Sequence, residues 1–136
     1  MDSSEASNIF RKCLEKYIVF NEAEWIVFSQ HLGFKTLKKK KHFAEPETVC
    51  TEIGFIVSGS VRYYHIKDGE EITGYFSFEN EYVSSYKSFL KREPGFTYIQ
   101  ALEETKLIII TYKNMQQMLA NPMLAYKMER FGRLVA

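Results

Sequence analysis

Residues 55–76 read FIVSGSVRYYHIKDGEEITGYF, and this stretch decides the fold. Gly59 interrupts a first apolar run, and hydrophobic and polar residues then alternate with strand period on both sides of Asp68-Gly69. An Asp-Gly pair between two alternating runs is a strong hairpin signal, because both central residues of the turn need positive φ. The stretch therefore predicts an antiparallel hairpin that follows a strand turn at Gly59.

The same pattern of short strands extends in both directions from this hairpin. Between residues 33 and 111, brief runs rich in Val, Ile, Tyr, Phe and Thr are separated by Gly, Pro and acidic turns. Residues 98–102 and 107–111 are two such runs around Glu103-Glu104-Thr105, and we interpret them as a further strand pair. The sequence thus predicts a mainly β fold with flanking helices, in which residues 33–111 form an antiparallel roll.

Helical periodicity replaces this pattern in residues 1–32. Asn21, with Glu24 three residues later, predicts a capping box that starts a second helix, and Gly33 ends that helix. We expect Trp25 in the core. The apolar stripe of the first helix is expected to consist of Phe10, Leu14, Tyr17 and Ile18.

Residues 112–136 return to helical spacing. Thr111 is a candidate cap, and Asn121-Pro122 ends one helix and begins the next. The last segment has the a/d spacing of a coiled-coil seam over fewer than two heptads, so it predicts either a dimer interface or a helix packed on its own roll. The seam residues are Leu124, Met128, Phe131 and Val135.

Length and composition limit the class of protein. A chain of 136 residues, 46% apolar and 15% aromatic, fits one folded domain and excludes disorder. The net charge of +1 excludes a strongly basic nucleic-acid binder, although residues 43–110 are acidic and both flanks are basic. The two cysteines form no disulfide framework, and the sequence shows no signal peptide or membrane span. We therefore expect a cytoplasmic protein that is not inserted in a membrane.

The element order and two stretches of sequence resemble the effector domains of Crp/Fnr transcription regulators and other cyclic-nucleotide-binding domains. Residues 51–64, TEIGFIVSGSVRYY, are similar to the family's I-x-F-I-x-x-G-x-V-R strand, and residues 99–107, IQALEETKL, to its A-L-E-D-S-E-L segment. The resemblance implies one domain over residues 1–136 with a jelly-roll-like, double-stranded β-helix. It also implies a homodimer through the C-terminal helix, with DNA bound only through a C-terminal part that this chain lacks.

The segment that binds the ligand in the family, here residues 84–97 and named the cassette, departs from the family pattern. The family holds the nucleotide with a Gly-Glu pair and a phosphate-binding Arg, whereas this chain has Ser84-Ser85 and, at residues 94–97, PGFT. The resemblance thus implies an unknown small-molecule effector other than cyclic AMP. Two alternatives remain: the aromatic residues simply fill the old pocket, and the two serines cap a helix. The candidate pocket residues are Tyr75, Phe78, Tyr82, Ser84, Ser85, Tyr86, Arg92, Thr97 and Tyr98.

No residue pattern indicates catalysis, a cofactor or a metal site. His31, His42 and His65 are too scattered for a cupin-type metal centre, and no nucleophile elbow, P-loop or dinucleotide fingerprint occurs. The basic stretch at residues 35–42 is interpreted as a solvated face rather than a contact for DNA phosphates or an acidic partner. We therefore expect the effector-sensing and dimerisation domain of a bacterial Crp/Fnr-like regulator; the alternative is a stand-alone ligand-binding or protein-interaction module.

Overall fold

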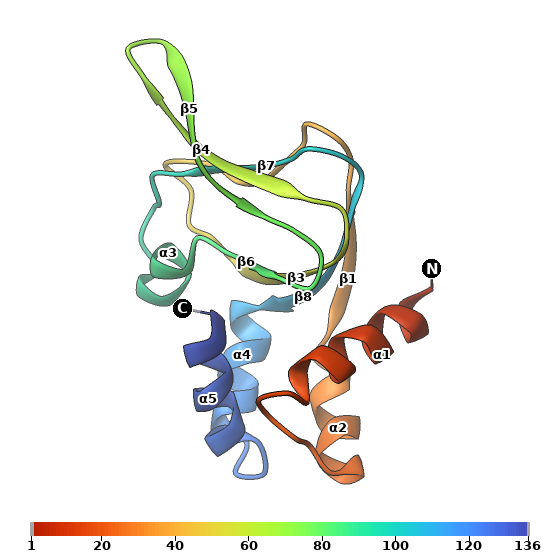
Figure 1. Cartoon of the computed structure of the whole chain (residues 1–136). Helices are drawn as coiled ribbons and strands as arrows, with labels where there is room; N and C mark the ends of the chain where they lie inside the picture. The colour runs from red at the N-terminus through yellow and green to blue at the C-terminus, as the bar shows by residue number, and fades with distance from the viewer. Residues whose placement is uncertain (1, 136) are drawn as a thin grey trace.

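The hairpin forms where the sequence predicts it. In the computed structural model, which describes residues 2–135, β4 (Val61–Lys67) and β5 (Glu70–Ser77) pair antiparallel. Asp68 and Gly69 have φ of 54° and 81°, so both central residues of the turn adopt the left-handed conformation that the Asp-Gly signal implies. The hairpin extends beyond the rest of the roll as a two-stranded arm (Figure 1).

Two four-stranded antiparallel sheets face each other and form the roll (Figure 1). The predicted pairing of residues 98–102 with 107–111 is wrong, because β7 and β8 lie in different sheets and the chain crosses between the sheets after Ala101. One sheet has the order β1-β8-β3-β6 and the other β2-β7-β4-β5. The remaining strands are β1 (Gly33–Leu37), β2 (His42–Ala44), β3 (Glu52–Ser58), β6 (Tyr82–Val83), β7 (Tyr98–Ala101) and β8 (Thr105–Thr111).

The strand turn at Gly59 is another crossing between the sheets, from β3 to β4. Gly59 has a φ of 107°, which confirms the predicted need for glycine. The buried Thr105 lies beside it: its hydroxyl accepts a hydrogen bond from the Ser60 N–H and lies within hydrogen-bonding distance of the Ser60 carbonyl, 3.2 Å in each case. The two crossings therefore hold each other in place.

Strands β3 and β8 separate two hydrophobic cores. Alternate residues, such as Ile56 and Leu107, point into the roll, while Phe55 and Ile108 point toward the helices. Because both faces of this sheet are covered, its strands read as nearly continuous apolar runs rather than alternating ones. The roll core is Leu37, Ile56, Val61, Val83, Ile99, Ala101, Leu107 and Ile109.

The N-terminal helices cover this sheet together with the C-terminal ones (Figure 1). They are α1 (Ser3–Leu14) and α2 (Glu22–Ser29), and α2 begins with the predicted capping box between Asn21 and Glu24. The expected stripe of the first helix is partly wrong, because α1 ends at Leu14. Tyr17 is 61% exposed, whereas Ile18 is buried in the following segment. Trp25 is only partly buried, against Phe28.

The C-terminal segment forms α4 (Tyr112–Ala120), capped by Thr111 as predicted, and α5 (Ala125–Val135). Three of the four predicted seam residues, Leu124, Met128 and Phe131, are at most 1% exposed within the single chain, and Val135 is partly buried. Phe131 packs against Phe10, Phe28 and Tyr82. Within the single chain the stripe is thus core, which is the second of the two alternatives that the sequence allows.

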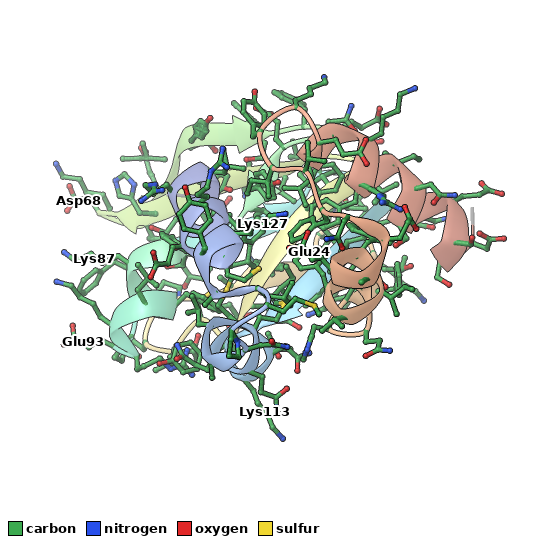
Figure 2. All side chains as sticks on the ribbon, turned by 90° about the horizontal axis from the view of Figure 1, so that it is seen from below. Glu24, Asp68, Lys87, Glu93, Lys113 and Lys127 are labelled. Atoms are coloured by element: carbon green, nitrogen blue, oxygen red, sulfur yellow. The ribbon has the colours of Figure 1, made fainter. Side chains whose placement is uncertain are left out.

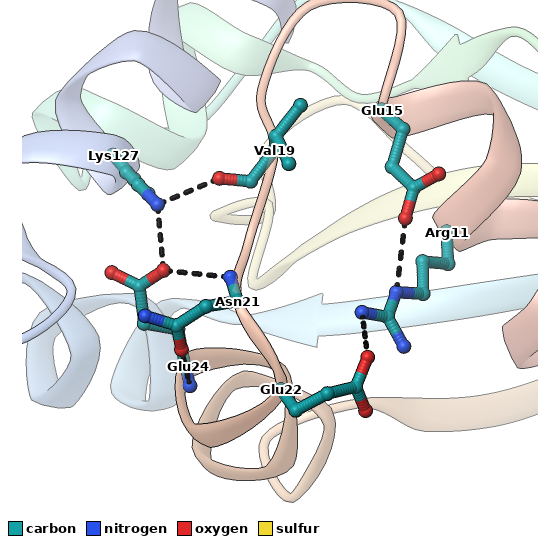
Figure 3. A network of polar contacts seen from close by, with 7 residues as sticks. All are labelled: Arg11, Glu15, Val19, Asn21, Glu22, Glu24 and Lys127. Carbon is teal, nitrogen blue, oxygen red and sulfur yellow. Dashed lines mark hydrogen bonds and ion pairs between the residues drawn. The ribbon is translucent and has the colours of Figure 1, made fainter.

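A polar network fixes α5 against the N-terminal helices (Figure 3). Lys127 Nζ donates to Glu24 Oε1 and to the Val19 carbonyl, both at 2.6 Å. The hydrogen bond from Lys127, followed by that from the Asn21 backbone, lowers the pKa of Glu24. Arg130 adds a hydrogen bond of 2.9 Å to the Tyr17 carbonyl. The position of α5 is therefore set by polar contacts as well as by its apolar face.

Candidate functional site

The predicted cassette lies between β6 and β7 and contains the short helix α3 (Tyr86–Lys91). Ser84 hydroxyl donates to the Glu52 carbonyl at 3.2 Å, so it ties the cassette to β3. Ser85 occupies the N-cap position of α3, but its side chain makes no capping hydrogen bond within the described chain. The interpretation of the serines as helix caps therefore holds for Ser85, by position and without a side-chain hydrogen bond, and is wrong for Ser84.

A hollow of about 260 Å³ lies between α3 and the loop that leads to β7. Ser85 and Thr97 both line it, so the structure brings these two candidates together. Gly95 lies beside them, and a Cβ built on it would be 2.8 Å from Ser85 Oγ. A side chain as large as the family's arginine does not fit at Gly95 unless Ser85 moves.

Arg92 does not replace the phosphate-binding arginine that the cassette lacks. It ends α3 in the left-handed conformation, with φ 58°. Its guanidinium donates to the Cys50 carbonyl at 3.1 Å and to the Phe89 carbonyl at 3.3 Å, and it lies 3.9 Å from the centre of the Tyr112 ring. The side chain is thus held on the helical side of the cassette by these contacts.

The larger hollow beside the roll has a volume of about 510 Å³, and we name it the roll–helix hollow. Two predicted residues, Tyr75 on β5 and Tyr82 on β6, line it together with the end of α5. Burial raises the pKa of the Tyr82 hydroxyl far above its usual value, so this group stays protonated at neutral pH. The full lining is Tyr17, Tyr75, Ser77, Asn80, Glu81, Tyr82, Arg133, Leu134 and Val135.

Tyr63 connects this hollow to the cassette, and sequence reasoning missed it. Its hydroxyl hydrogen-bonds to Ser77 Oγ at 3.0 Å, and its ring lies 5.4 Å from that of Tyr75. Burial raises its pKa, and hydrogen bonds with Ser77 and the Ser84 backbone partly offset this effect. A signal for Tyr63 was present, since it alternates on the same face as Val61 in a strand paired with the one that holds Tyr75.

The other candidates lie elsewhere. Tyr98 stacks on Tyr64 with ring centres 4.7 Å apart, and Phe78 is exposed and stacks on Phe76. Tyr86 stacks on Phe89 and faces a separate groove between α3, α4 and α5. The nine predicted residues therefore do not form one cavity. The roll–helix hollow is also lined by Arg133, Glu81 and Ser77, which the sequence did not indicate.

The chemistry of the roll–helix hollow is polar and aromatic. It offers tyrosine and serine hydroxyls, an Asn80 amide, one cation at Arg133 and one carboxylate at Glu81. The Phe78 N–H donates to Glu81 Oε1 at 2.7 Å, which orients the carboxylate. Such groups recognise a small molecule by hydrogen bonds and ring contacts. In the described part of the chain, no three His, Cys, Asp or Glu residues gather closely enough to share a metal ion.

The chain is similar in structure to cyclic-nucleotide-binding domains. A cyclic nucleotide-binding domain from Methylobacillus flagellatus KT matches with a TM-score of 0.78 and 14% identity, over 96% of this chain and 78% of that one. Thermus thermophilus catabolite activator protein matches with a TM-score of 0.68 and 15% identity, over 85% of this chain and 55% of that one. The c-di-GMP responsive global regulator CLP of Xanthomonas campestris matches with a TM-score of 0.67 and 17% identity, over 81% of this chain and 53% of that one.

These similarities establish the fold: the chain has the β-roll and C-terminal helix of a cyclic-nucleotide-binding domain, as the resemblance implies. Crp/Fnr-type regulators are among its structural neighbours, and the chain spans about half the length of the two regulators named above. No protein-family model and no curated sequence matches it. Between residues 2 and 135, no helix is both long and apolar enough to cross a bilayer.

Proposed function

We propose that this chain is the effector-sensing domain of a Crp/Fnr-like regulator and that its effector binds in the roll–helix hollow. The observation that carries this proposal is that residues of both the roll and α5 line the hollow. Tyr75 and Ser77 come from the roll, and Arg133 comes from the end of α5. An occupant would contact both parts at once. It would bind two positions of α5 unequally, which is the physical requirement for a signal.

Cyclic AMP is not the proposed effector. The family's Gly-Glu pair is replaced by Ser84 and Ser85, Gly95 leaves no room for an arginine beside Ser85, and Arg92 is engaged with backbone carbonyls. A phosphate placed here would lack its charge-assisted contact, which is worth about 1.5–3 kcal/mol. The structural neighbour CLP is described as responsive to c-di-GMP, which supports looking for an effector other than cyclic AMP.

The proposed output is binding and association rather than catalysis. We propose a homodimer in a cytoplasmic setting, and DNA contact through a part of a longer protein. Because the apolar face of α5 is buried within the chain, the opposite face is the proposed dimer surface. On that face Tyr126 is 71% exposed, and Glu129 and Arg130 are also exposed.

A second function, as a protein-interaction module, is favoured by the arm. The β4–β5 hairpin carries exposed apolar side chains at Ile66, Ile72 and Phe76, and the exposed Phe78, directly after β5, stacks on Phe76 with ring centres 6.2 Å apart. Exposed apolar residues gathered on one projecting element are typical of a contact surface. This module would signal by association alone, with the roll–helix hollow empty.

A thermal-shift panel tests the effector proposal. The purified chain is melted with cyclic AMP, cyclic GMP, c-di-GMP and a set of aromatic and anionic metabolites. A ligand at 100 times its Kd adds about 2.7 kcal/mol, which raises Tm by several degrees. The shift should disappear in Tyr75→Ala and Ser77→Val but persist in Tyr126→Ala, whose side chain is outside the hollow.

Two results would contradict the proposal. A shift that both hollow variants retain would place the ligand elsewhere. A shift caused by cyclic AMP would show that the cassette has compensated for its missing groups. A panel in which no compound moves the Tm would favour the interaction module, which a pull-down with Phe76→Ser and Phe78→Ser variants as controls would then test.

A further inference from the structure

A second cavity lies on the other side of α5, between α3, α4 and α5. We name it the three-helix groove; its volume is about 490 Å³, a size that suits a small molecule. Its walls are mainly apolar: Phe89 and Leu90 come from α3, Met115 and Leu119 from α4, and Met128 from α5. The two methionines give these walls an adaptable surface.

Gly132 keeps the groove open on the α5 side. It lines the groove, and a Cβ built on it would be 3.0 Å from the Tyr86 hydroxyl oxygen. A longer side chain at this position would therefore fill space that is now part of the groove. Burial raises the pKa of Tyr86, so its hydroxyl stays protonated and can donate a hydrogen bond to an occupant.

The surroundings of the groove are basic. Helices α3, α4 and α5 together contain six basic residues and one acidic residue, a net charge of +5. Lys127 is paired with Glu24, but among residues 2–135 neither Lys87, Lys91 nor Lys113 forms an ion pair. Lys87 and Lys113 project outward from the three-helix side of the molecule (Figure 2), and the groove itself is lined by one cation, Arg133, and one carboxylate, Glu129.

We propose that the three-helix groove binds an anionic amphiphile: a molecule with an acyl or aryl body and a carboxylate, sulfonate or phosphate head. The body would lie between the methionine and leucine side chains, and the head would lie near Arg133 and Tyr86. Charge complementarity favours an anionic head, because the three helices keep a net charge of +4 once the pairing of Lys127 with Glu24 is counted. This site lies on the other side of α5 from the roll–helix hollow and shares only Arg133 with its lining, so it goes beyond the proposed effector.

The test uses dodecanoate below its micelle concentration, measured by calorimetry and by displacement of anilinonaphthalene sulfonate. We expect saturable binding to one site, and weaker binding of dodecanol, which has the same chain without the charge. Gly132→Leu should reduce dodecanoate affinity at least tenfold by filling the groove. Gly74→Leu is the matched control, because a Cβ at Gly74 meets nothing within 4 Å.

A second variant tests the groove without a change in the core, in case Gly132→Leu does not fold. Leu90 lies on the groove and is 52% exposed, so Leu90→Glu removes an apolar contact and repels the anion without disturbing the core. Ile66→Glu is its control, since Ile66 is 51% exposed on the distant arm. Circular dichroism melts establish that all four variants are folded.

Three results would overturn the inference. The first is equal dodecanoate affinity in Gly132→Leu, Leu90→Glu and their controls. The second is equal affinity for dodecanol, which would remove the role of charge. The third is binding to phosphatidylglycerol vesicles with none to monomeric dodecanoate, which would show that the basic helices contact a lipid surface and not a single amphiphile.

Discussion

At Gly59 the backbone conformation and the surroundings both exclude a side chain. The residue has a φ of 107°, a value that L side chains rarely adopt. A Cβ there would lie 2.5 Å from Thr105 Oγ1 and 2.7 Å from Thr105 Cα. The second neighbour is backbone and cannot rotate away. A side chain at Gly59 would therefore separate the β3–β4 crossing from the β7–β8 crossing.

We predict that Gly59→Val lowers the free energy of unfolding by at least about 3 kcal/mol, from strain and from the displaced Thr105 together. Urea denaturation followed by circular dichroism measures this change. Gly74→Val is the control, because a Cβ at Gly74 meets nothing within 4 Å and its φ is not positive. Equal midpoints for the two variants would show that the crossing tolerates a side chain.

Helix α5 has two faces with different roles. The face with Leu124, Met128 and Phe131 is part of the helical core, whereas Tyr126 and Arg133 lie on its exposed side. A heptad-like spacing cannot distinguish these cases, because a helix packed on its own sheet needs the same apolar stripe as a helix packed on a partner. Any dimer through α5 must therefore use side chains that the apolar stripe does not contain.

This assignment predicts opposite effects for two charged variants. Phe131→Glu should unfold the protein or cost more than about 4 kcal/mol, because it buries a carboxylate among Phe10, Phe28 and Tyr82. Tyr126→Glu should leave Tm nearly unchanged and should reduce the sedimenting species from dimer to monomer. A folded, monomeric Phe131→Glu together with a dimeric Tyr126→Glu would restore the apolar stripe as the interface.

At the scale of the whole molecule, local signals were predictable from the sequence and long-range ones were not. The Asp68-Gly69 turn and the Asn21–Glu24 capping box each depend on residues within one turn, so the sequence indicates them directly. The separation of β7 from β8 depends on which distant strands they meet. The same holds for the site: Arg133 reaches the hollow, and Arg92 turns away from it, only because of the way α5 and α3 pack.

The two cores share strands β3 and β8, so we expect the helices and the roll to unfold as one cooperative unit. Phe55 and Ile108 belong to the helical core, and their neighbours Ile56 and Leu107 belong to the roll core. Loss of either core would expose one face of a sheet that both cores need. The helices cannot detach while the roll stays intact, and a ligand that moves α5 therefore acts on a cooperative structure.

We therefore predict a single two-state unfolding transition, with equal calorimetric and van't Hoff enthalpies in differential scanning calorimetry. Phe55→Ala and Ile56→Ala should each cost about 2–5 kcal/mol and should lower the same Tm, although their side chains lie in different cores. Trp25 fluorescence, which reports on α2, should follow the calorimetric transition in both variants. Two resolved transitions, one moved only by Phe55→Ala and the other only by Ile56→Ala, would show that the helices and the roll unfold separately.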